Sequence, residues 1–522
     1  MIREISRRKC LRLWLCKPEY MERTKWENRF VLLRFWKKNY MMFLKDLKRF
    51  KMERLYDKLK AYSESDFYAF HMPGHKRNKT LLGIELPYDL DITEIDGFDD
   101  LHHADGILKE EQERAARVFG AEESHFLVNG STAGILSAVM GCTHRGDKIL
   151  VARHCHKSIY HAIYMNGLVP RYVYPEFDIS MHMNGEISKE DVAKALAAEP
   201  DIKAVVIVSP NYDGVVSDVK GIAEVAHSYR IPLIVDEAHG PHFGFHPAFP
   251  GRANDLGADV VINSLHKTLP SLTQTAILHI NGKLANRRRI KKYLDMLQSS
   301  SPSYIFMASL DACVDFLDGK CEEAFELYVE RLQKFREELK PLQHLQILRT
   351  EHYDISKVVI STANANITSP ELADRLRKEY HLEMEMTGGT YVLAMTTVAD
   401  TQEGLDRLKA ALLEIDDQLE AKPAVSGSIE ISGELPRLEQ YFTPQEAADR
   451  EEDGEAEEIP WKESEGHISL EYAYLYPPGS PVIVPGERIS REAVELLCYY
   501  ETQNLQIEGI QTEGKIKVWK HE

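Results

Sequence analysis

The stretch Ala258–Ile280, ADVVINSLHKTLPSLTQTAILHI, determines how the rest of the sequence is interpreted. Its apolar run Val260–Ile262 predicts a short buried strand, and Thr275–Ile280 predicts a second one. Between them Lys267 stands beside a histidine and several hydroxyl residues. An amine that is partly shielded from water is more easily deprotonated and can attack an aldehyde. The pattern therefore indicates an imine-forming lysine, although an ordinary lysine at a strand end would give the same local sequence.

Two upstream stretches favour the catalytic interpretation of Lys267. The stretch Pro232–His239, PLIVDEAH, places Asp236 at the end of an apolar strand, where a carboxylate is costly to bury without a cationic partner. The stretch Phe126–Gly134, FLVNGSTAG, predicts a strand, a turn and a helix start, which offer backbone N–H groups and a helix dipole to a phosphate. This order fits pyridoxal phosphate (PLP), with Asp236 paired to the ring nitrogen and Lys267 carrying the aldehyde.

Seven motifs together resemble the bacterial ornithine/lysine/arginine decarboxylase family. They are HMPGHK (71–76), NGST (129–132), RHCHKS (153–158), SPNYDG (209–214), VDEAH (235–239), NSLHKTL (263–269) and YPPGSPVIVPGE (476–487). The resemblance extends from about Met52 to the end of the chain, with every motif in family order. It implies the aspartate-aminotransferase fold (fold type I) with PLP as cofactor. The implied reaction is α-decarboxylation of a basic amino acid to its amine and CO2 in polyamine-type metabolism, with arginine ahead of lysine and then ornithine.

The region between residues 121 and 280 alternates strands with helices. We expect strands at Phe126–Asn129, Lys148–Ala152, Arg171–Tyr174, Ala204–Val208, Leu233–Asp236, Val260–Asn263 and Thr275–Ile280. Near-continuous apolar strands between helices predict an α/β fold, with a mostly parallel seven-stranded sheet covered on both faces. Ligands of such sheets bind at the carboxyl ends of the strands. Ser131, Asp236 and Lys267 all lie at or just after such ends.

The charge distribution separates the first 51 residues from the rest. They hold 16 Lys/Arg against 5 Asp/Glu, a charge of +11, so that the chain's net −18 leaves −29 for residues 52–522. They also hold three of the five tryptophans. We expect residues 1–51 to be a basic extension outside the fold. The alternative is a segment that binds a membrane surface or an anionic partner.

The remaining chain is expected to form two domains. Residues 52–340 would be the PLP-binding large domain with an N-terminal arm, and residues 341–522 a smaller α+β domain of the Orn/Lys/Arg decarboxylase type. The expected elements of the smaller domain include strands Ile347–Arg349, Val358–Ile360 and Tyr391–Ala394 and helices Pro370–Tyr380 and Glu403–Glu420. The acidic tract Glu446–Glu465 is expected to be a solvated helix or loop.

Composition limits the partners and the compartment. The acidic net charge argues against nucleic acid as a partner, and no apolar run approaches the ~20 residues of a membrane span. Seven cysteines without regular spacing indicate a reducing cytoplasm rather than a disulfide framework. We therefore expect a cytoplasmic protein that binds neither nucleic acid nor a membrane.

The resemblance assigns roles to individual residues. His156 would stack on the pyridine ring and His239 would flank the cofactor, although a structural histidine is the competing role for His239. His266 or Lys267 would return a proton to Cα. The expected catalytic set is Lys267, Asp236, His156 and His266. The expected cofactor-binding set is Ser131, Thr132, His156, Asp236, His239, Ser264, His266, Lys267 and Ser300.

Two of the implied roles concern the subunit boundary and the substrate. Ser300, in the run Gln298–Pro302, would reach the phosphate of the neighbouring subunit, which implies a homodimer or a higher homo-oligomer. Glu487 would bind the distal cation of the substrate, with an ordinary surface carboxylate as its alternative.

Metal binding is the alternative for the histidine-rich motifs. His71 and His75 are four residues apart, but a proline and a glycine between them make a helix improbable. His154, Cys155 and His156 lack a second ligand pair of suitable spacing. His239, His242 and His246 are interrupted by a proline and two glycines. We therefore expect no metal site.

Two rival functions stay open. An aminotransferase or lyase of the same fold would use the same electron sink, so spacing alone does not separate it from a decarboxylase. A catalytically silent paralogue with a regulatory role is the second rival, and the retention of Lys267, Asp236 and His156 together argues against it.

Overall fold

The structure is a computed structural model that describes residues 53–178, 183–348, 352–421, 435–475, 479–502 and 505–520. The chain divides into two units, Met1–Arg54 and Leu55–Glu522. The expectation for residues 1–51 lies outside the described residues. None of the helices in the described ranges has the length and apolar character that crossing a bilayer requires.

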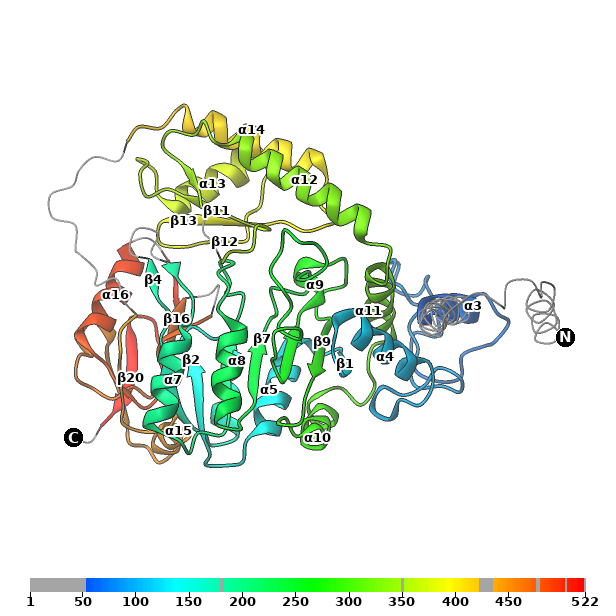
Figure 1. Cartoon of the computed structure of the whole chain (residues 1–522), viewed down its shortest axis with the longest axis horizontal. Coiled ribbons are helices and arrows are strands. Elements are labelled where there is room, and N and C mark those ends of the chain that lie inside the picture. The colour runs from blue at the N-terminus through cyan, green and yellow to red at the C-terminus, as the bar shows by residue number, and fades with distance from the viewer. Residues whose placement is uncertain are drawn as a thin grey trace, which may run out of the picture. The chain divides into compact units, whose positions relative to one another are not determined.

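A seven-stranded sheet forms the centre of the large domain (Figure 1). Its strands are β1 (Glu123–Leu127), β2 (Lys148–Ala152), β3 (Val169–Val173), β6 (Val205–Val208), β7 (Leu233–Asp236), β8 (Val260–Asn263) and β9 (Ala276–Ile280). They lie in the order β1-β9-β8-β7-β6-β2-β3, and only β9 pairs antiparallel with its neighbours. The predicted mostly parallel sheet is confirmed, and each predicted strand overlaps an observed one.

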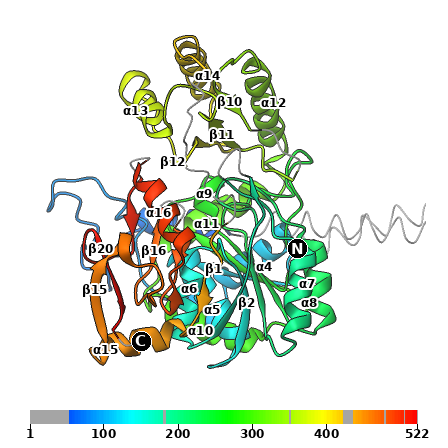
Figure 2. The same cartoon turned by 90° about the vertical axis from the view of Figure 1, so that its left-hand side faces the viewer.

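Helices cover both faces of this sheet (Figure 2). The helices α7 (Lys189–Ala198) and α8 (Val219–Ser228) lie on one face, and α5 (Gly130–Cys142) and α10 (Arg287–Leu297) lie on the other. A glycine permits the contact between α5 and α10, because a Cβ atom at Gly141 would lie 2.8 Å from the Cα of Ile290. The β strands are buried as a result, which explains their near-continuous apolar sequences.

Four further helices pack beside the sheet around a second apolar core. They are α3 (Leu55–Ser63), α4 (Ile107–Phe119), α11 (Tyr304–Leu317) and α12 (Glu322–Glu338). A short helix, η2 (Leu101–His103), precedes α4, and the one-turn helix α9 (Leu265–Thr268) follows β8. Two small strands, β4 (Phe177–Asp178) and β5 (Met183–Asn184), form a separate pair. Helix α6 (Lys157–Met165) follows β2 and contacts α5.

The chain beyond α12 first forms a four-stranded antiparallel sheet. It contains β10 (Gln346–Ile347), β11 (Lys357–Ser361), β13 (Tyr391–Met395) and β12 (Met386–Thr387), in that order. Helices α13 (Ser369–Tyr380) and α14 (Gln402–Asp416) pack against it around their own apolar cluster. These positions agree with the predicted strands and helices of the second half. The last residue of the predicted strand Ile347–Arg349 lies outside the described residues.

The last described part of the chain consists of small sheets, two α-helices and one short 3₁₀ helix. Its elements are β14 (Glu439–Gln440), α15 (Pro444–Glu452), β15 (Ala456–Pro460), η3 (Trp461–Glu463), β16 (Ala473–Leu475), β17 (Pro481–Ile483), β18 (Glu487–Arg488), α16 (Arg491–Thr502), β19 (Ile507–Glu508) and β20 (Lys515–Trp519). The prediction of a solvated helix or loop for the acidic tract was wrong in part. After α15, the tract continues as β15, a strand paired with β20, and then as the short helix η3, which begins at the buried Trp461. The sequence-based prediction missed this strand because acidic residues occupy the exposed positions of β15.

Candidate active site

A cavity of about 440 Å³ opens at the carboxyl ends of β7 and β8, beside the start of α5. This is the edge at which open parallel sheets bind their ligands. Eight of the predicted site residues line it: Ser131, Thr132, His156, Asp236, His239, Ser264, His266 and Lys267. Ser300 and Glu487 do not. The structure thus assembles most of the predicted site from separate segments between residues 131 and 267.

The start of α5 forms a cradle for an anion. Gly130 adopts a φ of 74°, and a side chain at this position would meet open space within 4 Å rather than protein. The Asn129 side chain does not cap the helix, and the first N–H groups of a helix have no partner inside it. The Ser131 and Ser264 hydroxyls lie 2.5 Å apart at the same place. Backbone amides and two hydroxyls therefore converge where a phosphate would need donors.

Asp236 supplies a carboxylate at the end of β7. It is almost completely buried, and its Oδ1 accepts a hydrogen bond from the Ala238 amide at 3.1 Å. Burial raises the pKa of this carboxyl group, and the nearby Lys267 opposes that rise. A cationic N–H group in the cavity would remove the cost of keeping Asp236 ionised.

Lys267 lies in α9, immediately after β8, and its Nζ is 2.8 Å from Nε2 of His239. Burial lowers the pKa of Lys267. Burial and the adjacent lysines hold the pKa of His239 well below its ordinary value, so the ring is neutral near pH 7. The arrangement gives the lysine a larger amine fraction than an exposed lysine would have.

The two other predicted histidines are also held in defined states. His156 caps α6, and its Nδ1 accepts a hydrogen bond from the Ser158 amide at 3.2 Å. Burial lowers the pKa of His156 to about 4. His266 Nδ1 lies 2.8 Å from the Thr275 carbonyl and donates to it, which leaves Nε2 of the neutral ring as an acceptor. Burial lowers the pKa of His266 as well.

The structure adds residues that the sequence did not assign to the site. Asn211, Tyr212 and Asp213, from the SPNYDG motif, line the cavity. The ring of Tyr212 lies 4.6 Å from that of His239. Asp213 accepts a hydrogen bond from the Tyr391 hydroxyl, and burial raises its pKa to about 6. The motif itself was the available signal, but its spacing gave no indication of a role.

Lys357 is a further residue that the sequence did not reveal. It begins β11 in the smaller antiparallel sheet, and its Nζ lies 2.9 Å from Nδ1 of His239. It is fully buried. A lysine that opens an apolar strand is common, and only tertiary packing brings this one to His239.

Glu487 occupies a different environment from the one expected. Its Oε2 accepts hydrogen bonds from Arg153 Nη2 at 2.8 Å and from the Val484 amide at 2.8 Å. Both charged side chains are buried, and the Arg153 guanidinium also stacks 4.7 Å from the ring centre of Tyr172. The carboxylate is therefore committed to an internal arginine. The expected role in binding the substrate cation is corrected to a buried ion pair.

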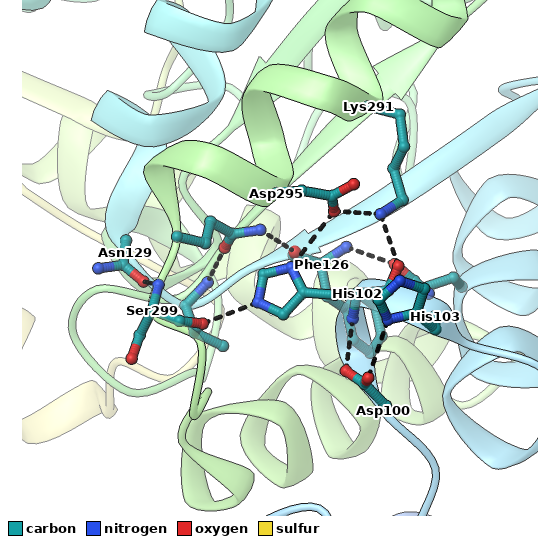
Figure 3. Close-up of polar contacts among 11 residues, drawn as sticks. Asp100, His102, His103, Phe126, Asn129, Lys291, Asp295 and Ser299 are labelled. Carbon is teal, nitrogen blue, oxygen red and sulfur yellow. Dashed lines mark hydrogen bonds and ion pairs between the residues drawn. The ribbon is translucent and has the colours of Figure 1, made fainter.

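The serine run that contains Ser300 is exposed and held next to the α5 cradle. Figure 3 shows the His102 ring between Asp295 and Ser299, and the Ser299 amide beside Asn129. His102 Nε2 donates to the Ser299 carbonyl at 2.8 Å, and the Ser299 amide donates to Asn129 Oδ1 at 3.1 Å. Ser300 itself is exposed to solvent. These contacts fix the run at the rim and leave Ser300 outside this chain's cavity.

These groups match the requirements of PLP. The α5 cradle suits a phosphate, Asp236 suits a protonated ring nitrogen, and Lys267 suits an aldehyde.

In the described ranges, no three His, Cys, Asp or Glu side chains are grouped as a metal site would group them. His71 bonds to the Tyr62 hydroxyl, and His75 stacks on Tyr88.

Comparison with known proteins gives one consistent family. Residues 53–364 match the family described as Orn/Lys/Arg decarboxylase, major domain, and residues 433–514 match its C-terminal domain. A protein of Bacillus subtilis named arginine decarboxylase is 34% identical over 471 residues, which cover 87% of this chain and 95% of that protein. An arginine decarboxylase of Bacillus anthracis is 32% identical, with 89% of this chain and 97% of that protein covered.

Solved structures agree on the fold. The constitutive lysine decarboxylase of Escherichia coli superposes with a TM-score of 0.77 at 20% identity, covering 97% of this chain and 87% of that one. Lysine decarboxylase A of Pseudomonas aeruginosa superposes with a TM-score of 0.74 at 23% identity, covering 96% and 84%. The expected fold type I architecture is confirmed.

Proposed function

The chain belongs to the Orn/Lys/Arg decarboxylase family, and on that premise we propose that it decarboxylates arginine with PLP as its cofactor. Decarboxylation of a basic amino acid, and with it the carboxy-lyase class, follows from the family and from its named relatives. The choice of arginine is supported by the relatives that are 32–34% identical over most of their length and are named arginine decarboxylase.

The observation that supports the cofactor is the shared cavity of Lys267, Asp236 and the α5 cradle. Each group alone occurs in many proteins. Their convergence in one cavity provides an amine, a buried acid and an anion site on the scale of a single small molecule. We infer that Ser131, Thr132 and Ser264 receive the phosphate.

Bound PLP supplies an electron sink for the pair released when the bond between Cα and the carboxylate breaks. Lys267 Nζ would bind the aldehyde, and the Asp236 carboxylate would hold a proton at the ring nitrogen. His156 lines the same cavity and would help to exclude water from the bound cofactor. Lys267 Nζ would return a proton to Cα after CO2 leaves, because His266 holds its one N–H toward the Thr275 carbonyl and is an acceptor at Nε2.

The direct test is CO2 release from arginine, lysine and ornithine, assayed side by side on the purified chain. We expect the highest kcat/KM for arginine, and Lys267→Ala serves as the blank. A higher value for lysine or ornithine would reassign the substrate. Transfer of the amino group without CO2 release would contradict decarboxylation itself.

We further propose a homodimer in which Ser300 reaches the partner's phosphate. The segment between residues 67 and 86, in the N-terminal arm, exposes an unusual number of large apolar side chains. Phe70, for example, is 91% exposed. Such a patch indicates an interface. The exposed Ser300 beside the α5 cradle is consistent with a role across the subunit boundary.

Subunit complementation tests this arrangement. Lys267→Ala and Ser300→Glu are each expected to be inactive, because the first lacks the amine and the second places a charge against the phosphate. Mixed under conditions of subunit exchange, they should regain up to about a quarter of wild-type activity, since one site in each heterodimer is intact. An active monomer at nanomolar concentration, or no recovery in proven heterodimers, would contradict the proposal.

Location and pathway complete the proposed function. A role in polyamine-type metabolism is supported by the amine that decarboxylation of a basic amino acid produces, and we propose that the chain acts in the cytoplasm. Fractionation of cells that express the chain, with its activity measured in each fraction, tests the location.

A further inference from the structure

The distal cation of a basic substrate needs a carboxylate partner in or beside the cavity. Arginine, lysine and ornithine all end in a cation, and a cation that leaves water must be paired with an acceptor group. Glu487, the carboxylate expected for this task, is bound to Arg153 in the interior instead. The cation of a bound substrate therefore requires another acidic residue.

Two carboxylate side chains, among the residues that the structure describes, line the cavity itself. Asp236 is 3% exposed, accepts a hydrogen bond from the Ala238 amide, and is proposed to serve the cofactor ring. Asp213 is 6% exposed and accepts a hydrogen bond from the Tyr391 hydroxyl at 2.5 Å. Both carboxylates are nearly closed to solvent and already have partners in the protein.

Glu385 is a third carboxylate, and it lies beside the cavity. It directly precedes β12, it is exposed to solvent, and it accepts a hydrogen bond from the Tyr212 hydroxyl at Oε1. Its side chain makes no other hydrogen bond, and no ion pair, with the described residues. Tyr212 lines the cavity next to His239, which adjoins Lys267. The tyrosine therefore links Glu385 to the part of the cavity near Lys267.

The charge of Glu385 also acts on this part of the cavity. Burial lowers the pKa of Lys267, and the charges of Asp236 and Glu385 oppose that change. Burial lowers the pKa of Lys357 as well, and Glu385 is again among the charges that oppose it. Glu385 thus lies within electrostatic reach of both amines without forming an ion pair with either. A basic side chain that extends from Lys267 could bridge this interval.

The hydrogen bond from Tyr212 orients the Glu385 carboxylate and leaves most of its acceptor capacity open. An ionised carboxylate has about four lone-pair sites, of which Tyr212 uses one. A guanidinium can donate two parallel hydrogen bonds to a carboxylate, whereas an ammonium acts as a point charge. Glu385 can therefore pair with either cation, and its planar group suits a guanidinium better.

We propose that Glu385 binds the distal cation of the substrate beside the cavity, and that Tyr212 orients the carboxylate for this contact. The inference rests on the proposed function, in which the substrate is a basic amino acid. Because Glu385 is exposed, the substrate cation loses only part of its water when it binds. Glu385 thereby sets the preference for a basic side chain and takes no part in breaking the bond at Cα.

Two amines that differ in one group test the role of Glu385. Agmatine is the amine that arginine yields on decarboxylation, and carbamoylputrescine has a neutral urea group in place of the guanidinium. Titration calorimetry on the PLP-loaded chain gives the Kd of each, and the contribution of their shared amino end cancels in the ratio. Wild type should bind agmatine at least about tenfold more tightly, and Glu385→Gln should bind the two within about threefold of each other.

The matched control is Glu379→Gln, which removes a carboxylate from the same smaller domain, where Glu379 pairs with Arg375. It should leave the ratio of the two Kd values as in wild type. Equal affinities for the two amines in wild type would overturn the proposal, because the site would then not distinguish charge. An unchanged ratio in Glu385→Gln would overturn it as well, since any weakening would then be structural.

A kinetic test extends the binding result to Tyr212. For arginine, kcat/KM should fall about tenfold or more in Glu385→Gln, chiefly through KM, and about threefold in Tyr212→Phe, which keeps the carboxylate without its anchor. A fall in kcat at unchanged KM in Glu385→Gln would contradict the proposed binding role. No change in Tyr212→Phe would remove Tyr212 from the arrangement.

The binding ratio does not depend on turnover. A chain that releases no CO2 from arginine, lysine or ornithine would refute the proposed function, whereas the ratio of the two Kd values alone decides whether Glu385 binds the cation.

Discussion

Two of the buried polar clusters in the described part of the chain differ in how their charges are balanced. Arg153 and Glu487 are 1% and 0% exposed and neutralise each other at 2.8 Å. In the second cluster, Lys267 and Lys357 share the neutral His239 and no carboxylate hydrogen-bonds directly to either amine among the described contacts. The first cluster has complementary charges. The second has two like charges that cannot both be present.

The difference separates a structural role from a chemical one. An ion pair with both partners present stabilises the position of the chain segments that carry it, and removing one partner leaves a buried charge. A pair of amines around one imidazole gains little from packing, and its main effect is to shift protonation. We therefore expect substitutions in the first cluster to change stability and substitutions in the second to change reactivity.

The largest expected effect comes from Lys267→Ala. CO2 release should fall by at least about a thousandfold, because the group that carries the cofactor aldehyde is lost. The free energy of unfolding should change by about 1 kcal/mol or less, since a partly buried amine is removed with its desolvation cost. Parallel assays of activity and denaturant unfolding measure both effects. Activity near the native level would exclude Lys267 from the reaction.

Glu487→Ala tests the opposite side of the comparison. The variant should lose about 3–5 kcal/mol of unfolding free energy, because Arg153 keeps a buried charge without its partner. Where the variant is folded, kcat/KM for arginine should stay within about threefold of wild type.

The double variant Arg153→Met/Glu487→Leu is the control for Glu487→Ala, and it should recover much of the lost stability. If Glu487→Ala instead raised the KM for arginine tenfold without loss of stability, Glu487 would be a substrate-binding residue. The distinction between the two clusters would then not hold.

Asp213→Asn probes a buried acid at the cavity wall. The folded pKa of Asp213 is about 6 and its ordinary value is 3.8, so the folded state binds the extra proton between these values. Its contribution to stability is present below pH 3.8 and is lost as the pH rises through 6. The asparagine variant removes this loss. The difference between its free energy of unfolding and that of wild type should therefore rise by about 1–3 kcal/mol between pH 4 and pH 7. Urea unfolding at several pH values gives the two curves, and parallel curves would contradict the prediction.

The smallest expected effect is that of deleting residues 2–51. Their +11 charge contrasts with the acidic remainder of the chain, and they belong to a separate unit from residues 55–522. Activity and PLP binding should remain within about twofold of the full chain. Loss of folding on deletion would show that this segment is an integral part of the structure.

The central sheet was predictable because its strands are short apolar runs with both faces covered. All seven were predicted, and the polar residues at their ends identified the cavity edge. The acidic strand β15 was missed, because its exposed glutamates resemble a solvated segment. Strand prediction fails where a strand pairs at an edge and buries little of its own surface.

The sequence alone determined the order of cradle, acid and lysine, because each follows a strand whose apolar run is visible locally. Only the tertiary structure decided which charged groups meet. Arg153 and Glu487 are separated by 334 positions, and His239 and Lys357 by 118. No local pattern encodes such a pairing, because it depends on how sheets and helices pack. For the same reason the local sequence did not predict that Glu487 pairs with Arg153, or that Lys357 lies beside the candidate active site.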